Sequence, residues 1–127
     1  MKEIKQVVTF EASPHDVFEA FMDEEKHSKF TGSPAKISRE KDGEFSIYNG
    51  SIQGKNIEII QDKKIVQTWR YDDWPEGHYS TITLEFEEKE GKTEMTFTQV
   101  GVPDDKCEDI KQGWIDYYWE PMKKMLA

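Results

Sequence analysis

The chain has 127 residues, of which 34% are charged, and its 17 basic and 26 acidic side chains give a formal net charge of −9. This length predicts a single domain over residues 1–127, large enough to form a core without disulfides. Nucleic acids and anionic membranes are disfavoured as partners, because both are polyanions. With a lone cysteine, no leader-like apolar stretch and no apolar run that could cross a membrane, we expect a cytoplasmic protein.

The N-terminal part of the chain predicts a strand followed by two short helices. Residues 3–11 alternate between apolar and polar side chains, as a half-buried strand does. Ser13 and Pro14 are typical of a helix N-terminus, and an apolar stripe follows over residues 17–22. A second short helix is expected over residues 24–30, before a Thr-Gly-Ser-Pro sequence that breaks it.

Six antiparallel strands are predicted for the middle of the chain. They cover residues 35–40, 44–48, 51–60, 64–71, 80–88 and 92–100. Asn49-Gly50 lies between two alternating runs and is a strong hairpin signal. The alternation indicates a sheet with one buried and one solvated face. The polar strand residues Gln53, Asn56, Gln67 and Gln99 are assigned to the solvated face, and the alternative is an inward position that orients a ligand.

From Pro103 onward the sequence predicts one long amphipathic helix. Apolar residues recur every three or four positions, at Cys107, Ile110, Trp114, Tyr117, Tyr118, Met122 and Met125. Cys107 is expected to be a buried small hydrophobe. Pro121 predicts a kink between residues 117 and 121, because proline removes one backbone hydrogen bond. Residues 117–119 span about 200° of an ideal helix, so one of them must face outward, and Trp119 is the best candidate.

The order of these elements indicates an α+β fold of the helix-grip type. A curved antiparallel sheet of about six to seven strands would wrap around the long C-terminal helix, with the two short helices after the first strand. Such a fold often leaves a cavity between sheet and helix. The candidate lining of that cavity is Trp69, Trp114, Tyr117 and Tyr118, and the alternative is that these rings are solid core packing.

The loop between the strands at 64–71 and 80–88 is the first candidate for a binding site. Histidine beside carboxylates is a common combination for metal binding or acid–base chemistry. However, no second histidine lies nearby, and the spacing matches no metal signature. A loop-structuring or partner-contact role is therefore favoured. The candidate partner surface is Trp74, Pro75, Glu76 and His78.

No catalytic, metal or cofactor site is predicted elsewhere in the chain. His15 and His27 are expected to face solvent, and the scattered glycines form no phosphate-binding loop. Because no nucleophile–base pair and no set of metal ligands is legible, we interpret the chain as a binding protein and not as an enzyme.

Short sequence blocks along the whole chain point to a known family. They are Phe30-Thr31 with Pro34-Ala35, Gly43-x-Phe45, Asn49-Gly50 with Gly54, Ile65-Val66, Trp69-Arg70, Trp74-Pro75-Glu76-Gly77-His78, Thr81-Ile82-Thr83-Leu84, Gly91-x-Thr93-Glu94, Gly101-x-Pro103, and Gln112-Gly113-Trp114 followed by Tyr117-Tyr118. On these blocks the chain resembles the C-terminal domain of the activators of heat-shock protein 90 ATPase. That domain belongs to the helix-grip superfamily of START and birch-pollen-allergen-like proteins.

The resemblance implies a co-chaperone whose partner is a heat-shock protein 90-type chaperone. Full-length activators of this kind also carry an N-terminal domain and a short Asn- and Trp-rich motif, so a stand-alone version of the second domain is expected. The leading hypothesis is therefore a non-enzymatic binding protein. The alternative is a carrier of a small hydrophobic ligand or lipid, held in a cavity between the sheet and the C-terminal helix.

Overall fold

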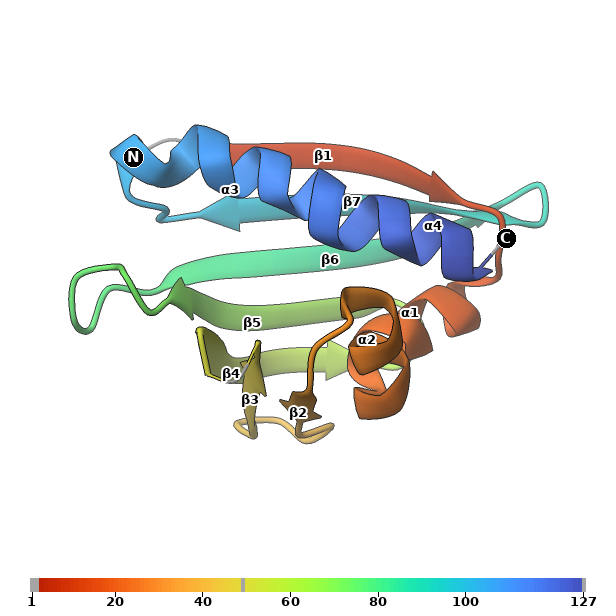
Figure 1. Cartoon of the computed structure of the whole chain (residues 1–127). Helices are drawn as coiled ribbons and strands as arrows, with labels where there is room; N and C mark the ends of the chain where they lie inside the picture. The colour runs from red at the N-terminus through yellow and green to blue at the C-terminus, as the bar shows by residue number, and fades with distance from the viewer. Residues whose placement is uncertain (1–2, 49, 127) are drawn as a thin grey trace.

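The helices of the molecule pack on one face of a seven-stranded antiparallel sheet (Figure 1). This computed structural model describes residues 3–48 and 50–126. The strands are β1 (Glu3–Phe10), β2 (Ala35–Ile37), β3 (Glu44–Ile47), β4 (Ile52–Ile60), β5 (Lys64–Tyr71), β6 (Ser80–Lys89) and β7 (Lys92–Val100), in the spatial order β1-β7-β6-β5-β4-β3-β2. The helices are α1 (Pro14–Met22), α2 (Glu24–Thr31), α3 (Cys107–Trp114) and α4 (Glu120–Leu126), with a short 3-10 turn (Asp104–Lys106) before α3 and a π-helical turn (Ile115–Trp119) before α4. The predicted α+β helix-grip fold is confirmed.

The predicted element boundaries agree closely with the observed ones. The side chain of Ser13 caps α1 by accepting a hydrogen bond from the backbone N–H of Asp16 at 3.2 Å. Strand β2 ends earlier than predicted, because a turn follows in which the N–H of Gly43 donates to the carbonyl of Glu40 at 3.0 Å. The predicted Asn49-Gly50 hairpin includes Asn49, which lies outside the described residues.

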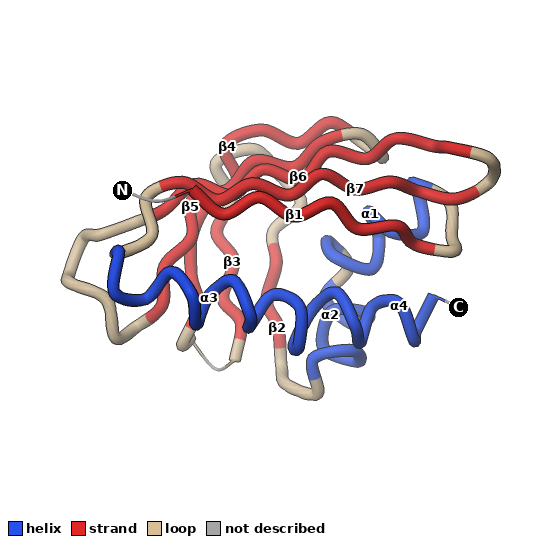
Figure 2. The backbone as a smooth tube through the Cα atoms, turned by 90° about the horizontal axis from the view of Figure 1, so that it is seen from above, coloured by secondary structure: helices blue, strands red, loops and turns tan. Residues whose placement is uncertain are grey.

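Two features of β4 distort its pairing with β5, where the sheet curves. The register between the two strands shifts between Asn56 and Glu58, which makes Ile57 an extra residue. Gly54 permits a very close approach, since a Cβ atom there would lie 1.8 Å from the carbonyl oxygen of Thr68. Figure 2 shows the curvature, with β2 and β3 bending toward the side of the sheet on which the helices lie.

The irregularity predicted near Pro121 takes the form of the π-helical turn. Pro121 cannot donate a backbone hydrogen bond, and in an α-helix its ring would crowd the carbonyl of Tyr117. The N–H of Glu120 instead donates to the carbonyl of Ile115, five residues earlier, so this turn holds one more residue than an α-helical turn. The extra residue rotates Trp119 inward, where it is 2% exposed, while Tyr117 is 64% exposed. The prediction that Trp119 faces outward is therefore wrong, because it assumed ideal α-helical rotation.

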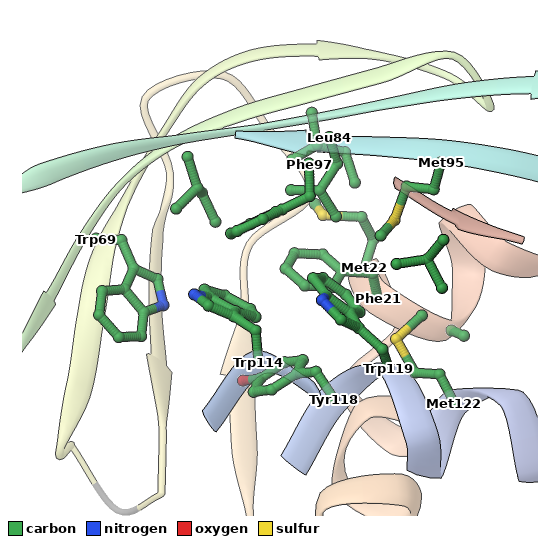
Figure 3. Packing of buried hydrophobic residues seen from close by; sticks show 14 of the residues in the cluster. Phe21, Met22, Trp69, Leu84, Met95, Phe97, Trp114, Tyr118, Trp119 and Met122 are labelled. Atoms are coloured by element: carbon green, nitrogen blue, oxygen red, sulfur yellow. The ribbon is translucent and has the colours of Figure 1, made fainter. Parts of the chain in front are cut away.

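A cluster of aromatic rings packs between the C-terminal helix and the sheet (Figure 3). Trp114 and Trp119 stack with ring centroids 5.3 Å apart and planes at 14°. Phe97 of β7 contacts both rings, with centroids 4.5 Å from Trp114 and 5.2 Å from Trp119. Because aromatic side chains bury a large apolar area, this cluster is a main source of stability.

Polar side chains inside the core connect the helix to the sheet. The indole N–H of Trp114 donates to Oε1 of Gln99 at 2.8 Å, and Nε2 of Gln99 donates to Oγ of Ser80 at 2.9 Å. The hydroxyl of Ser80 donates in turn to the carbonyl of Trp69 at 2.8 Å. This chain crosses β7, β6 and β5. A buried network in which each member has a partner fixes the position of its members.

Three of the four polar strand residues assigned to the solvated face are buried instead. Asn56, Gln67 and Gln99 are at most 1% exposed, whereas Gln53 is exposed. Nε2 of Gln67 donates to Oδ1 of Asn56 at 2.9 Å. Strand alternation does place these residues inward, since Gln67 is in phase with the buried Ile65 on β5. The prediction failed because side-chain polarity was given more weight than the period of the strand.

His27 lies in the core, and the prediction that it faces solvent is wrong. Its Nδ1 must carry the proton, because the partner 2.8 Å away is the carbonyl of Phe21. The neutral Nε2 then accepts the hydroxyl of Tyr118 at 3.0 Å. Desolvation by burial lowers the pKa of His27 from 6.5 to about 4, so the imidazole is neutral at pH 7. His15, by contrast, is exposed as expected.

We expect Gly54→Ala to destabilise the fold by more than about 3 kcal/mol, because a Cβ atom would collide with the backbone of β5 and not with a movable side chain. The matched control is Gly113→Ala in α3, where the nearest described atom to a Cβ is Cδ2 of Tyr117 at 3.8 Å. That substitution should raise stability by up to about 1 kcal/mol, because glycine is a poor helix former. Urea denaturation monitored by tryptophan fluorescence measures both changes. Equal effects at the two positions would contradict the close approach of β4 and β5.

Protonation of His27 should destabilise the fold at acid pH. The folded state holds His27 with a pKa of about 4 and the unfolded chain with one near 6.5, so the unfolded state binds the proton more readily. The stability contributed by neutral His27 is complete above pH 6.5 and is lost as the pH falls toward 4, by about 3 kcal/mol in total.

The measurement compares the free energy of unfolding of the wild type with that of His27→Gln across pH 4–7. Carboxylates titrate in both proteins, so the difference between the two curves isolates the histidine. The difference should narrow steadily below pH 6.5, and a constant difference would contradict a neutral, buried His27.

Candidate binding site

A pocket of about 490 Å³ opens between α3 and the curved half of the sheet. It is lined by residues from the end of β3, from β4 and β5, from the β5–β6 loop and from the helix, namely Tyr48, Ile52, Trp69, Tyr71, Asp73, Trp74, Lys106, Asp109, Ile110, Gly113, Trp114, Tyr117 and Tyr118. All four residues named from the sequence as candidate cavity lining are among them. Its volume falls within the range of about 300–1,000 Å³ typical of small-molecule pockets.

A contiguous set of buried rings forms the inner wall of this pocket. Trp69 lies 5.4 Å from Trp114 and 5.5 Å from Trp74 between ring centroids, and Tyr118 lies 4.7 Å from Trp114. Figure 3 shows Trp69 on the sheet facing Trp114 on the helix. The wall is rigid, because Trp114 is hydrogen-bonded to Gln99 and Tyr118 to His27.

The rim of the pocket is polar and carries a net negative charge. Nζ of Lys106 lies 3.3 Å from a carboxylate oxygen of Asp73, which joins the start of the C-terminal helix to the β5–β6 loop. Asp109 is a second carboxylate on the same rim. Tyr117 stands at the opening and is mostly exposed. With two carboxylates and one ammonium group, the rim does not favour an anionic ligand.

Two buried polar atoms of lining residues have no hydrogen-bond partner among the described residues, Oη of Tyr48 and Nε1 of Trp74. Leaving such groups unpaired costs about 1–3 kcal/mol each. Burial raises the pKa of Tyr48, and the neighbouring Tyr71 and Tyr117 raise it further. The hydroxyl therefore keeps its proton at neutral pH and remains a donor, as the indole N–H of Trp74 always is.

Gly113 keeps part of the helix surface beside the pocket free of side-chain atoms. It lies in the last turn of α3, between residues that face the pocket. Glycine within a helix costs about 1 kcal/mol relative to alanine. A side chain at this position has room, because a Cβ atom there would lie 3.8 Å from the nearest described atom, a ring carbon of Tyr117. The pocket would be smaller with any larger residue here.

Arg70 holds the β5–β6 loop in one conformation. Its Nη2 donates to the carbonyls of Trp74 at 2.7 Å and Pro75 at 3.2 Å, and its Nε donates to the carbonyl of His78 at 3.4 Å. Nε2 of His78 donates to the carbonyl of Gly101 at 2.7 Å, which ties the loop to the end of β7. His78 thus has a loop-structuring contact, one of the two roles favoured from the sequence.

The four residues of the candidate partner surface are not equivalent in the structure. Pro75 and Glu76 are exposed, and His78 is half-buried. Trp74 is only 4% exposed, so its ring cannot serve as a surface anchor, which corrects that part of the prediction. Its aromatic character suited it equally to packing, and it contacts the rings of Trp69 and His78. From here on, "the loop surface" denotes Pro75, Glu76 and His78.

The described residues hold no group of three or more histidine, cysteine, aspartate or glutamate side chains placed to bind a metal. Cys107 is buried, as expected from its place on the apolar side of the last helix. In the part of the chain that the structure covers, no helix is long and apolar enough to cross a membrane.

Known proteins resemble this chain over nearly its full length. A family model described as "Activator of Hsp90 ATPase homolog 1-like protein" matches residues 11–127. The human activator of 90 kDa heat shock protein ATPase homolog 1 is 37% identical over 94% of this chain and 35% of its own length. The Dictyostelium discoideum homologue is 39% identical over 89% of this chain and 30% of its own length. The chain thus spans about a third of these curated relatives.

Solved structures agree with this match. The crystal structure of an HSP90 activator from Plasmodium falciparum superposes with a TM-score of 0.94 at 30% sequence identity, over 99% of this chain and 96% of that one. A solution structure of the Aha1 dimer from Colwellia psychrerythraea, at 18% identity and a TM-score of 0.85, shares the fold. From sequence and structure together, this chain belongs to the family of activator of Hsp90 ATPase homolog 1-like proteins.

Proposed function

We propose that the chain is a non-enzymatic co-chaperone module that binds a heat-shock protein 90-type chaperone. The observation that carries this proposal is the family membership, with relatives named as activators of that chaperone's ATPase matching 94% of the chain at 37% identity. The contacts of the three histidines also favour a binding role over acid–base catalysis. His27 and His78 contact backbone carbonyls and His15 pairs with Asp62, so each has a structural partner.

The loop surface is the contact site that we assign to this partner. Pro75 and Glu76 are exposed at its tip, and Asp72 beside them is exposed as well. Arg70 fixes the backbone of the loop, so little conformational entropy is lost when a partner binds. The carboxylates suit a basic patch on the chaperone, and the chain's net charge of −9 would steer the two together at low salt.

Glu76→Lys should weaken chaperone binding about three- to tenfold at low ionic strength and less at high salt, because it reverses a charge at the proposed contact. Fluorescence anisotropy of the labelled chain, titrated with the purified chaperone of the same host, measures the affinity. The chaperone's ATPase rate is recorded in parallel, to separate binding from stimulation.

Glu88→Lys is the matched control for this charge reversal. Glu88 is exposed on β6, near the β6–β7 turn at the opposite end of the strand from the loop (Figure 1). It should bind like the wild type. The proposal is overturned if the wild-type chain does not bind at concentrations up to about 100 µM, and the loop assignment alone is overturned if the two variants weaken binding equally.

The pocket supports a second candidate function, a carrier of a small hydrophobic ligand. Its volume of about 490 Å³, its wall of tryptophan and tyrosine rings and the glycine in the helix beside it favour this candidate. A chain selected for stability alone would gain from a side chain at position 113.

Gly113→Leu should abolish ligand uptake while leaving the fold intact, because leucine would project into the pocket from a helix that tolerates it. Nile red, a neutral dye that fluoresces in apolar surroundings, serves as the probe. Gly113→Ala controls for the loss of the helical glycine and should retain most of the dye binding. Dye binding that persists unchanged in Gly113→Leu would show that the dye binds elsewhere on the molecule.

A further inference from the structure

We propose that the pocket between α3 and the curved half of the sheet binds an organic cation, an alkylated ammonium group carried on an apolar body. This inference rests on the second candidate function and names its ligand class. The observation that carries it is the combination of partly accessible aromatic rings and an excess of carboxylates around one opening.

Three tyrosines give the opening of the pocket its aromatic character. Tyr48 and Tyr71 are half-buried and Tyr117 is 64% exposed, so all three keep accessible surface, unlike the tryptophans behind them. They follow β3, end β5 and belong to the π-helical turn, so they reach the opening from three separate elements. The face of an aromatic ring is the negative part of its quadrupole and attracts a cation within about 6 Å of the ring centroid.

The charges at the opening favour a positive ligand. Lys106 is the single ammonium group among the described residues that line the pocket, and it lies 3.3 Å from a carboxylate oxygen of Asp73. Asp109 forms no ion pair with the described residues, so its charge is uncompensated. Burial and the nearby carboxylates of Asp72 and Asp73 raise the pKa of Tyr71, which indicates that a negative charge is disfavoured here.

The same features disfavour other classes of ligand. A metal ion needs several oxygen or nitrogen ligands, and the described residues offer no group of three or more such side chains. A carboxylate or phosphate would be repelled by the rim, and a neutral molecule would gain nothing from Asp109. A primary amine carries three donors that need acceptors. An ammonium group whose hydrogens are replaced by methyl groups needs none and can pack directly against the rings.

The test compares 3-hydroxyphenyltrimethylammonium with 3-tert-butylphenol, two probes of nearly equal shape that differ in a positive nitrogen against a carbon. Hydrophobicity alone favours the neutral probe. If the pocket recognises the charge, the cation should bind about tenfold more tightly. At about pH 6 both phenols are protonated and the carboxylates are ionised. Salt at about 0.15 M screens charges more than about 8 Å away.

The affinities are measured from the ¹H–¹⁵N NMR shift of the Gly113 amide. Gly113 belongs to the lining of the pocket, so its signal reports binding there and not elsewhere on the acidic surface. The signal is assigned by its disappearance from the glycine region of the spectrum in Gly113→Ala.

Tyr117→Phe and Tyr117→Leu test the contribution of the aromatic ring. Tyr117 is mostly exposed, so both variants should fold. Phenylalanine keeps the aromatic face and should retain the affinity for the cation. Leucine keeps apolar surface only and should lower that affinity about three- to fivefold. The affinity for 3-tert-butylphenol should change little in either variant.

Asp109→Asn and Glu108→Gln form a matched pair that tests the carboxylate. Both residues are exposed on α3, but only Asp109 lines the pocket. Asp109→Asn should lower the affinity for the cation about three- to fivefold and leave that for the neutral probe unchanged. Glu108→Gln should bind both probes like the wild type. Equal losses in the two variants would indicate attraction to the overall net charge of −9 and would overturn the assignment.

The outcomes separate the inference from the function on which it rests. If the cation binds no more tightly than 3-tert-butylphenol while Gly113→Leu still abolishes Nile red uptake, the cation assignment is overturned and the carrier function stands. If neither phenol probe binds and Gly113→Leu leaves Nile red binding unchanged, the carrier function fails and the inference fails with it. A preference for the cation that shrinks in Tyr117→Leu and is kept in Tyr117→Phe supports the inference.

Discussion

The hydrogen bond from Trp114 to Gln99 is the contact on which the arrangement of helix and sheet depends. It is buried, it joins α3 to β7, and it continues through Ser80 to the backbone of β5. A buried polar contact of this kind is satisfied in one register only, because a shift of the helix by one residue would leave both partners unpaired. The apolar contacts around it supply most of the stability but do not by themselves choose that register.

The π-helical turn is the second feature that positions the aromatic rings of the C-terminal helix against the sheet. With Trp114 fixed, ideal α-helical rotation would turn Trp119 away from the sheet. The extra residue in the turn before Pro121 brings the second ring back to stack on the first. The same rotation moves Tyr117 to the opening of the pocket, where it is exposed. Core packing and the shape of the binding site are therefore set by one local departure from α-helical geometry.

The elements and their order could be predicted from the sequence because alternation, capping residues and turn sequences are local signals. The aromatic residues of the pocket wall could be named for the same reason, since the period of the helix and of β5 puts them on one face. The burial of His27 and Trp74 could not be read in this way. The burial of His27 depends on its contacts with Phe21 and Tyr118, and the burial of Trp74 depends on its contact with Trp69. These contacts join segments that are distant in sequence or that lie on either side of a loop. Gln99 is an intermediate case. The period of β7 places its side chain inward, but its polarity led to the wrong assignment to the solvated face.

The residue at position 113 should indicate whether other sequences of the family have an open pocket. Because a large side chain at that position would project into the space beside the helix, one column of an alignment should divide the family. Members with glycine there would retain an open pocket, and members with leucine or phenylalanine would have a filled and more stable core. If the family had been selected for chaperone binding alone, no ligand would constrain position 113. The residue types found there would then follow helix propensity. The distribution of glycine at this position would thus distinguish selection for an open pocket from selection for chaperone binding alone.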